Sequence, residues 1–163
     1  MAVDTQPFLL AGLFATLCLL CGSLALIDLR RGIIPDALNL VLCGLGLAKA
    51  VITGGAAAGV GAIAEAIAVG AIFWLFRRLY FAVRKIQGLG LGDVKFLAAA
   101  APWVGMTGIP MLLLVAALSA LLVIGSAQLA GQGLTRQSSF PFGPFLGLGL
   151  LSTVAAQEWF GLI

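Results

Sequence analysis

The stretch Pro7–Ile27 reads PFLLAGLFATLCLLCGSLALI and contains no charged residue. At about 1.5 Å of rise per residue, a helix of this length extends over roughly 30 Å, the thickness of the hydrocarbon core of a bilayer. The whole chain shares this character, since 62% of its 163 residues are hydrophobic and only 9% are charged. We therefore predict an all-α integral membrane protein with a single domain over residues 1–163. Because Met1–Gln6 carry no Lys or Arg, we expect the first run to be retained and not cleaved as a signal peptide.

Five more apolar runs follow, separated by short polar or glycine-rich turns, and the six runs together predict six transmembrane helices. The fourth run is shorter than the ~20 residues that normally cross a bilayer, so we expect its start to lie below the membrane surface in a water-filled notch. We also expect Pro102 to kink this fourth helix. The predicted spans after the first are residues 37–52, a third span that starts between Ala56 and Ala62 and ends near Phe76, and residues 94–106, 109–130 and 140–163.

Basic residues gather in three of the predicted loops, residues 28–36, 77–92 and 131–139. Loops rich in Lys and Arg tend to stay in the cytoplasm. We therefore predict that these three loops are cytoplasmic and that both termini lie outside. The bases form no continuous face of the size of a nucleic-acid groove, so we expect no nucleic-acid partner. The loop bases are Arg30, Arg31, Arg77, Arg78, Arg84, Lys85 and Arg136.

Two aspartates lie at boundaries of predicted spans on this cytoplasmic side. Asp28 ends the first span, while Asp93 follows the glycine-rich turn Gly88–Gly92 and opens the fourth. An ionisable group at a membrane boundary is costly unless it is paired, solvated or neutral, which makes it a functional-site hypothesis by default. The glycines remove side chains beside Asp93 and let a second backbone approach it. The alternative is that the turn is only a loop and that Asp93 caps the next helix.

Two carboxyl groups on one face are the parts that aspartyl hydrolysis needs. When such groups approach each other, like-charge repulsion leaves them sharing one proton. The ionised member can take a proton from water while the protonated member polarises the scissile carbonyl, so we expect no metal and no cofactor. The chain has no histidine, which removes Ser-His catalysis and His-based zinc motifs; a Ser-Lys pair is an outside alternative. Cys18 and Cys21 lie inside the first span and are expected to fill the core.

Three segments of the chain resemble the type IV prepilin peptidases, which are membrane aspartyl proteases with a Gly-x-Gly-Asp motif. The sequence IDLRRGIIPD at residues 27–36 is similar to the family's first catalytic segment. The sequence GLGDVK at 90–95 is similar to its second, and PFGPF at 141–145 is similar to the signature of its final helix. A lone Gly-x-Gly-Asp would be weak evidence, whereas three segments in this order with this topology are specific, and the resemblance covers nearly the whole chain.

The resemblance implies that Asp28 and Asp93 form the catalytic dyad. Asp36 lies only eight residues after Asp28, but the family pattern and the Pro-Asp sequence favour Asp36 as a helix cap. Lys95 is expected either to pair with Asp93 or to anchor the interface. The resemblance gives substrate-binding or motif-supporting roles to Gly90, Gly92, Lys95, Pro35, Asp36, Pro141, Gly143 and Pro144.

The resemblance also implies the substrates. They are precursors of type IV pilins or type II secretion pseudopilins, cut after a glycine that ends a short basic leader, at the cytoplasmic face of the bacterial inner membrane. Larger family members N-methylate the new terminus with a cytoplasmic domain that carries two Cys-x-x-C pairs. Nothing in this sequence corresponds to that domain, so we expect cleavage without methylation. Which pilus or secretion system is served stays open.

Two other functions are weighed against this one. A presenilin-like intramembrane protease shares the Gly-x-Gly-Asp motif, but its Pro-Ala-Leu-Pro signature is absent from the sequence. A small proton- or cation-coupled transporter also uses membrane carboxylates, but the two halves of the chain show no convincing inverted repeat. Glu65 lies in the third span, where we expect it to pair with Lys49 near the outer boundary; a proton-carrying role is the less favoured interpretation.

Overall fold

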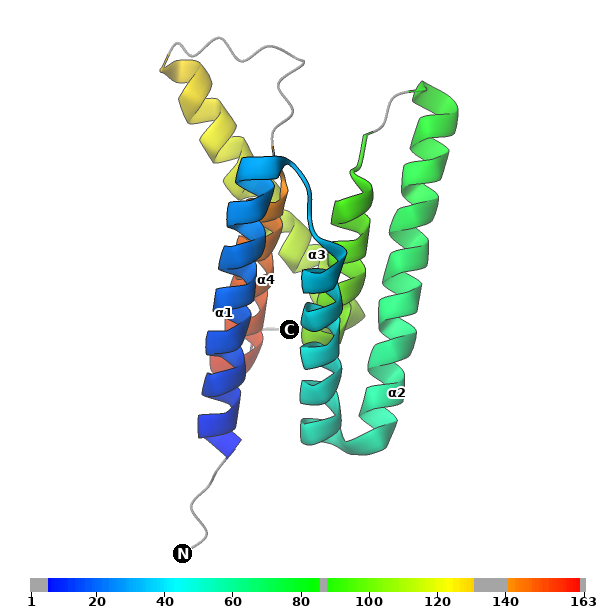
Figure 1. Ribbon diagram of the computed structural model, residues 1–163, viewed down its shortest axis with the longest axis vertical. Helices are drawn as coiled ribbons and strands as arrows, with labels where there is room; N and C mark the ends of the chain where they lie inside the picture. The colour runs from blue at the N-terminus through cyan, green and yellow to red at the C-terminus, as the bar shows by residue number, and fades with distance from the viewer. Residues whose placement is uncertain (1–5, 86–87, 131–140, 162–163) are drawn as a thin grey trace, which may run out of the picture.

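The computed structural model describes residues 6–85, 88–130 and 141–161, and every regular element within these ranges is an α-helix (Figure 1). Three of the helices are long and apolar enough to cross a membrane, which confirms the prediction of an all-α protein built from apolar helices. The predicted loop 131–139 with Arg136, Phe140 and the residues before Gln6 lie outside the described ranges. The helices are α1 (Gln6–Arg31), α2 (Asp36–Arg84), α3 (Leu91–Leu129) and α4 (Gly143–Phe160).

Both α2 and α3 contain one residue whose backbone is not helical. In α2 it is Gly55 (φ 74°, ψ −171°), and in α3 it is Gly105 (φ 69°, ψ 171°). Such positive φ values are readily adopted only by glycine. The first break coincides with the turn predicted at Thr53–Gly55. The second break, at Gly105, lies beside the predicted end of the fourth span at Met106, and α3 begins at Leu91, three residues before the predicted start. The non-helical residue is Gly105 and not Pro102.

The second half of α2 is longer than the sequence predicts. The prediction ends a span near Phe76 and begins a loop at Arg77, but α2 continues to Arg84. The C-cap residue is Lys85, which has a left-handed backbone (φ 57°). Its N–H donates to the Phe81 carbonyl at 2.9 Å. The bases do not end the helix because their long side chains can carry the charge away from an apolar surface while the backbone stays helical.

The first half of α3 is the best buried part of the bundle. Phe96, Trp103 and the small residues 99–101 are almost completely buried. The Trp103 indole N–H donates to the Leu42 carbonyl of α2 at 2.8 Å. Gly46 faces the same indole, where an added Cβ would lie 2.7 Å from Cδ1. The helix that follows the glycine-rich turn is therefore packed closely against α2.

Lys49 pairs with Glu158 of α4 and not, as predicted, with Glu65. The distance between Lys49 Nζ and Glu158 Oε1 is 2.5 Å, and the same Nζ donates to the Trp103 carbonyl at 3.4 Å. Glu65 lies instead beside the break in α3, since a Cβ on Gly105 would be 3.7 Å from Glu65 Oε2. Lys49 and Glu158 line one pocket together with Trp103, and Glu65 is not part of its wall.

The ends of the helices place the predicted site residues together. In Figure 1 the end of α1 and the starts of α3 and α4 lie toward one end of the bundle, and the bend of α2 lies at the opposite end.

Large apolar side chains cover much of the outer surface, among them Leu19, Leu40 and Leu122, each about three-quarters exposed. Such an apolar surface is unusual for a water-soluble monomer and suits a lipid environment.

Candidate active site

A cavity of about 1040 Å³ lies where α1 ends and α3 begins. The three segments that the sequence singles out, although far apart along the chain, all contribute to its wall. Asp28 and Asp93 therefore line one common cavity. The lining residues are Asp28, Leu29, Arg31–Ile34, Asp36, Gly88–Asp93, Lys95, Pro141 and Phe142.

Asp28 lies in the last turn of α1, and only 5% of its surface is exposed. Its Oδ2 accepts a hydrogen bond from the backbone N–H of Gly143, the first residue of α4, at 2.8 Å. The positive end of the α4 dipole adds a favourable interaction with a carboxylate at this position. A Cβ on Gly143 would lie 2.6 Å from Oδ2 of Asp28, so this contact leaves room only for glycine. Gly143 thus orients the Asp28 carboxyl group.

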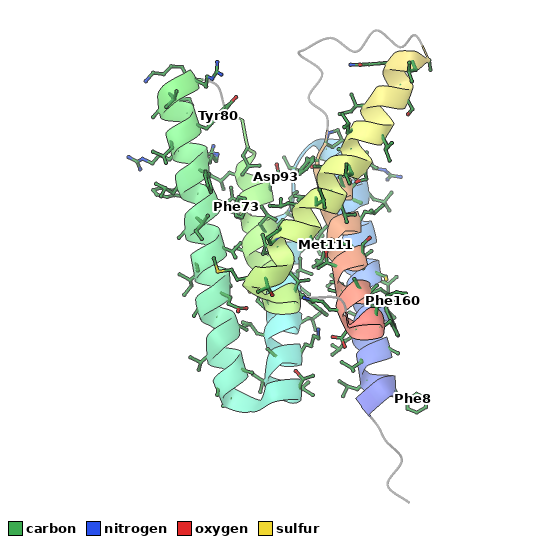
Figure 2. The ribbon with its side chains drawn as sticks, turned by 180° about the vertical axis from the view of Figure 1, so that it is seen from behind. Phe8, Phe73, Tyr80, Asp93, Met111 and Phe160 are labelled. Carbon is green, nitrogen blue, oxygen red and sulfur yellow. The ribbon has the colours of Figure 1, made fainter. Side chains whose placement is uncertain are left out.

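Asp93 is in the first turn of α3, near the start of the helix as Figure 2 shows. The N-cap residue is Gly90, and Asp93 follows three residues later inside the first turn. The two motif glycines have separate packing roles. A Cβ on Gly90 would lie 3.0 Å from Asp93 Oδ2, and a Cβ on Gly92 would lie 3.3 Å from the Cβ of Ile34. Gly90 therefore makes room for the carboxyl group, and Gly92 lets the turn pack against the segment after α1.

Asp36 and Lys95 form an ion pair across the cavity wall. Lys95 Nζ lies 2.7 Å from both Oδ1 and Oδ2 of Asp36, so Lys95 bonds Asp36 and not Asp93. The prediction of Asp36 as a helix cap is wrong, because the N-cap of α2 is Pro35 and no side chain bonds there. Pro35 (φ −65°, ψ 132°) supplies the extended backbone that precedes the helix. The pair joins the first segment to the second through exposed side chains.

Removing this ion pair is expected to cost little stability, because both side chains are exposed, Lys95 to 44% and Asp36 to 72%. In a double-mutant cycle of Lys95→Gln and Asp36→Asn, we expect a coupling energy below ~1 kcal/mol. Denaturant unfolding of the four proteins in one detergent measures it. A coupling of several kcal/mol would show that the pair holds the two segments together, contrary to this expectation.

The start of α4 supplies the third part of the site. Phe142 is the N-cap residue, and its carbonyl accepts bonds from the N–H groups of Phe145 and Leu146, both at 3.1 Å. Pro144 lies in the first turn, where its missing N–H is not needed. Pro141 lies within the predicted span 140–163 but precedes the helix and lines the cavity.

Two contacts that brace the glycine-rich turn do not follow from the sequence. Arg77 of α2 donates from Nε to the Leu89 carbonyl at 3.1 Å. A Cβ on Gly88 would lie 2.6 Å from Cε1 of Tyr80, so the ring packs directly on the turn. The sequence shows only a run of basic and aromatic residues here, which is typical of a membrane interface and does not indicate a contact with the turn.

The arrangement can support acid–base chemistry on water. Two carboxyl groups share a cavity that is large enough for water and a segment of peptide, and one of them is held by a backbone N–H. A pair of this kind can divide a single proton between a base and an acid. Within the described residues, no three His, Cys, Asp or Glu side chains gather closely enough to bind a metal ion together.

Comparison with known proteins identifies related chains. Residues 14–125 match the family described as the type IV leader peptidase family. A prepilin leader peptidase/N-methyltransferase of Burkholderia pseudomallei (strain K96243) is 36% identical over 141 residues, which cover 85% of this chain and 44% of the relative. The protein of the same name from Escherichia coli (strain K12) is 34% identical over 164 aligned residues, 94% of this chain and 66% of the relative. That from Legionella pneumophila is 33% identical over 148 residues, 90% of this chain and 50% of the relative.

The chain spans about half the length of the curated relatives it matches. No solved structure matches it. The family match covers well over half of the 163 residues, including the segments that carry Asp28 and Asp93. The chain therefore belongs to the type IV leader peptidase family.

Proposed function

We propose that the chain is a membrane aspartyl endopeptidase that removes the basic leader from type IV pilin or type II secretion pseudopilin precursors. The observation that carries the proposal is the single cavity in which Asp28, Asp93 and the start of α4 meet. The family membership supports it from the sequence side. The relatives named above are prepilin leader peptidase/N-methyltransferases, and we carry the peptidase part of that name to this chain.

In the proposed mechanism, Asp28 and Asp93 share one proton. The ionised carboxyl group takes a proton from a water molecule in the cavity, and the water oxygen attacks the scissile carbonyl. The protonated carboxyl group donates its proton to the carbonyl oxygen as charge develops there, which gives a tetrahedral intermediate. The carboxyl group that took the water proton then passes it to the leaving nitrogen as the C–N bond breaks, and the other carboxylate takes a proton back from a hydroxyl of the intermediate, so the pair again holds one proton. The Gly143 N–H fixes the orientation of Asp28 throughout, and the absence of a side chain at Gly90 keeps the space next to Asp93 open. Water is the only reagent that this scheme needs.

We further propose that the chain crosses the membrane six times as one domain, with both termini outside. The breaks at Gly55 and Gly105 support this count, because they divide α2 and α3 into two apolar segments each. Arg30, Arg31 and Arg84 lie at the ends of α1 and α2, toward the end of the bundle that holds the cavity. The positive-inside rule then puts the cavity at the cytoplasmic face of the bacterial inner membrane.

Cleavage of a pilin precursor by the purified chain in lipid vesicles tests the function. We expect release of the leader with its C-terminal glycine, measured by mass spectrometry of both products. A matched precursor, in which a valine replaces that glycine, is expected to stay intact, because a branched side chain hinders the approach of the scissile bond to the carboxyl groups. Failure to cleave several pilin and pseudopilin precursors, or equal cleavage of the matched pair, would contradict the proposal.

A further inference from the structure

A second pocket of about 450 Å³ lies on α2, separate from the cavity of Asp28 and Asp93. Its four lining residues are spaced three, one and three positions apart, so they share one face of the helix. Two of them are arginines, two are aromatic, and none is acidic. They are Trp74, Arg77, Arg78 and Phe81.

The arginines hold defined positions in this pocket. The guanidinium carbon of Arg78 lies 5.3 Å from the centre of the Trp74 ring, within the range of a cation–π contact. Arg77 is held by its Nε bond to the Leu89 carbonyl. Within the described residues, neither arginine forms an ion pair with a carboxylate. Two neighbouring guanidinium groups without an acidic partner suit a phosphate group, whose oxygens match their planar set of donors.

The surroundings of the pocket are apolar. Trp74 and Phe81 are both about half exposed, and Ile67, two turns before Trp74 on the same face of the helix, also presents a large exposed side chain. These residues belong to a helix that is long and apolar enough to cross a membrane. A phosphate carried on acyl chains would bury this apolar surface, whereas a free phosphate would leave it exposed to water.

We propose that the pocket binds the phosphate of an anionic phospholipid headgroup. The two guanidinium groups hold the phosphate oxygens, Trp74 and Phe81 cover the glycerol region, and the acyl chains follow the apolar surface of α2. The site has a direct link to the glycine-rich turn, because Arg77 both lines the pocket and bonds the Leu89 carbonyl. A bound headgroup therefore restrains the side chain that braces the turn before Asp93.

Binding is tested on the full chain in detergent by native mass spectrometry, with phosphatidylglycerol as the anionic lipid and phosphatidylcholine as the zwitterionic one. We expect the parent to prefer phosphatidylglycerol and Arg78→Gln to weaken that binding about tenfold, the loss of one charge-assisted bond. Arg84→Gln is the matched control, since it removes the same charge from the same helix outside the pocket. It is expected to change the affinity less than twofold.

Three outcomes would overturn the proposal. Equal losses in Arg78→Gln and Arg84→Gln would mean that the lipid responds only to net charge. Equal affinity of the parent for both lipids would remove the requirement for an anionic head. Displacement of phosphatidylglycerol by inorganic phosphate at a similar concentration would assign the pocket to soluble phosphate. None of these measurements uses cleavage, so they stand apart from the proposed peptidase activity.

A second measurement locates the lipid if Arg78→Gln unfolds. In vesicles, phosphatidylglycerol with brominated acyl chains is expected to quench the fluorescence of the parent more than that of Trp74→Phe, because bromine quenches only nearby indoles. When brominated phosphatidylcholine makes up the same fraction of the vesicle lipid, the difference in quenching between the parent and Trp74→Phe is expected to be at most half as large. An equal difference with the two lipids would contradict a site for the anionic head beside Trp74.

Discussion

Replacing Asp28 or Asp93 by asparagine is expected to lower the rate of prepilin cleavage by roughly 10²–10⁴-fold, the range for loss of a general acid or base. Asparagine has nearly the shape of aspartate but cannot exchange a proton at neutral pH. At residue 28 its amide oxygen can still accept the Gly143 N–H, which is 2.8 Å from Oδ2 in the parent, so the packing at α4 should survive. Initial rates with one precursor at equal amounts of folded protein measure the loss.

Asp36→Asn is the control for both variants. Asp36 lines the same cavity but is bonded to Lys95 and is largely exposed. Its replacement removes one carboxyl group from the cavity wall, as the other two changes do, and leaves both proposed catalytic groups in place. We expect less than about a fivefold change in rate, equivalent to ~1 kcal/mol for an exposed pair. If Asp36→Asn loses as much activity as Asp28→Asn, then the carboxyl groups of the cavity wall affect the rate in general. The proposed dyad would then have no special role. Full activity of either dyad variant would refute the aspartyl mechanism.

The sequence locates the apolar part of a helix better than its end. The first run was placed at Pro7–Ile27 with a loop from Asp28, but α1 extends over Gln6–Arg31, because hydropathy marks only the apolar run and the backbone stays helical through the charged residues after it. The turn at Gly55 was also predicted, since it interrupts an apolar run with glycines. The break at Gly105 was predicted to within two residues, since the fourth span was ended at Met106 and the fifth begun at Ile109. What stabilises that break is distant in sequence: Gln157 donates to the Val104 carbonyl at 2.9 Å.

Pairing partners were the least predictable part of the site. The three cavity segments could be grouped because topology and the family resemblance put them on one side. The partner of Lys95 could not be predicted, because Asp36 lies 59 residues away and only Val94 separates Lys95 from the nearer Asp93 in sequence. Proximity along a helix does not make side chains face each other at a spacing of two residues, which points them to different sides. In the same way, the partner of Lys49 comes from α4, and only the folded bundle reveals it.

Gly143→Ala is expected to lower kcat by roughly 10²-fold, the cost of a displacement of about 1 Å at a reacting group. An added Cβ would lie 2.6 Å from Oδ2, 2.9 Å from Cγ and 3.0 Å from Cβ of Asp28. Because the Asp28 Cβ is also in close contact, rotation of the carboxyl group alone does not relieve the clash, and α1 or α4 must shift. The N–H bond that orients Asp28 is then strained or lost. The KM is expected to change less than kcat, because most of the cavity wall comes from residues 32–36 and 88–95, which belong to neither α1 nor α4. Steady-state kinetics separates the two parameters.

The stability of the Gly143→Ala variant distinguishes a local effect from a global one. Alanine favours a helix over glycine by up to ~1 kcal/mol, so the substitution supports α4 even as it displaces Asp28. Gly44→Ala is the matched control, because a Cβ at residue 44 of α2 meets no atom within 4 Å. We expect Gly44→Ala to keep the parent rate. If Gly143→Ala also keeps it, the Asp28 carboxyl group does not need its bond to α4, and the role proposed for this contact is wrong. If Gly143→Ala has a low kcat but is no easier to unfold than Gly44→Ala, the loss of activity is local. The orientation of Asp28 then depends on the start of α4.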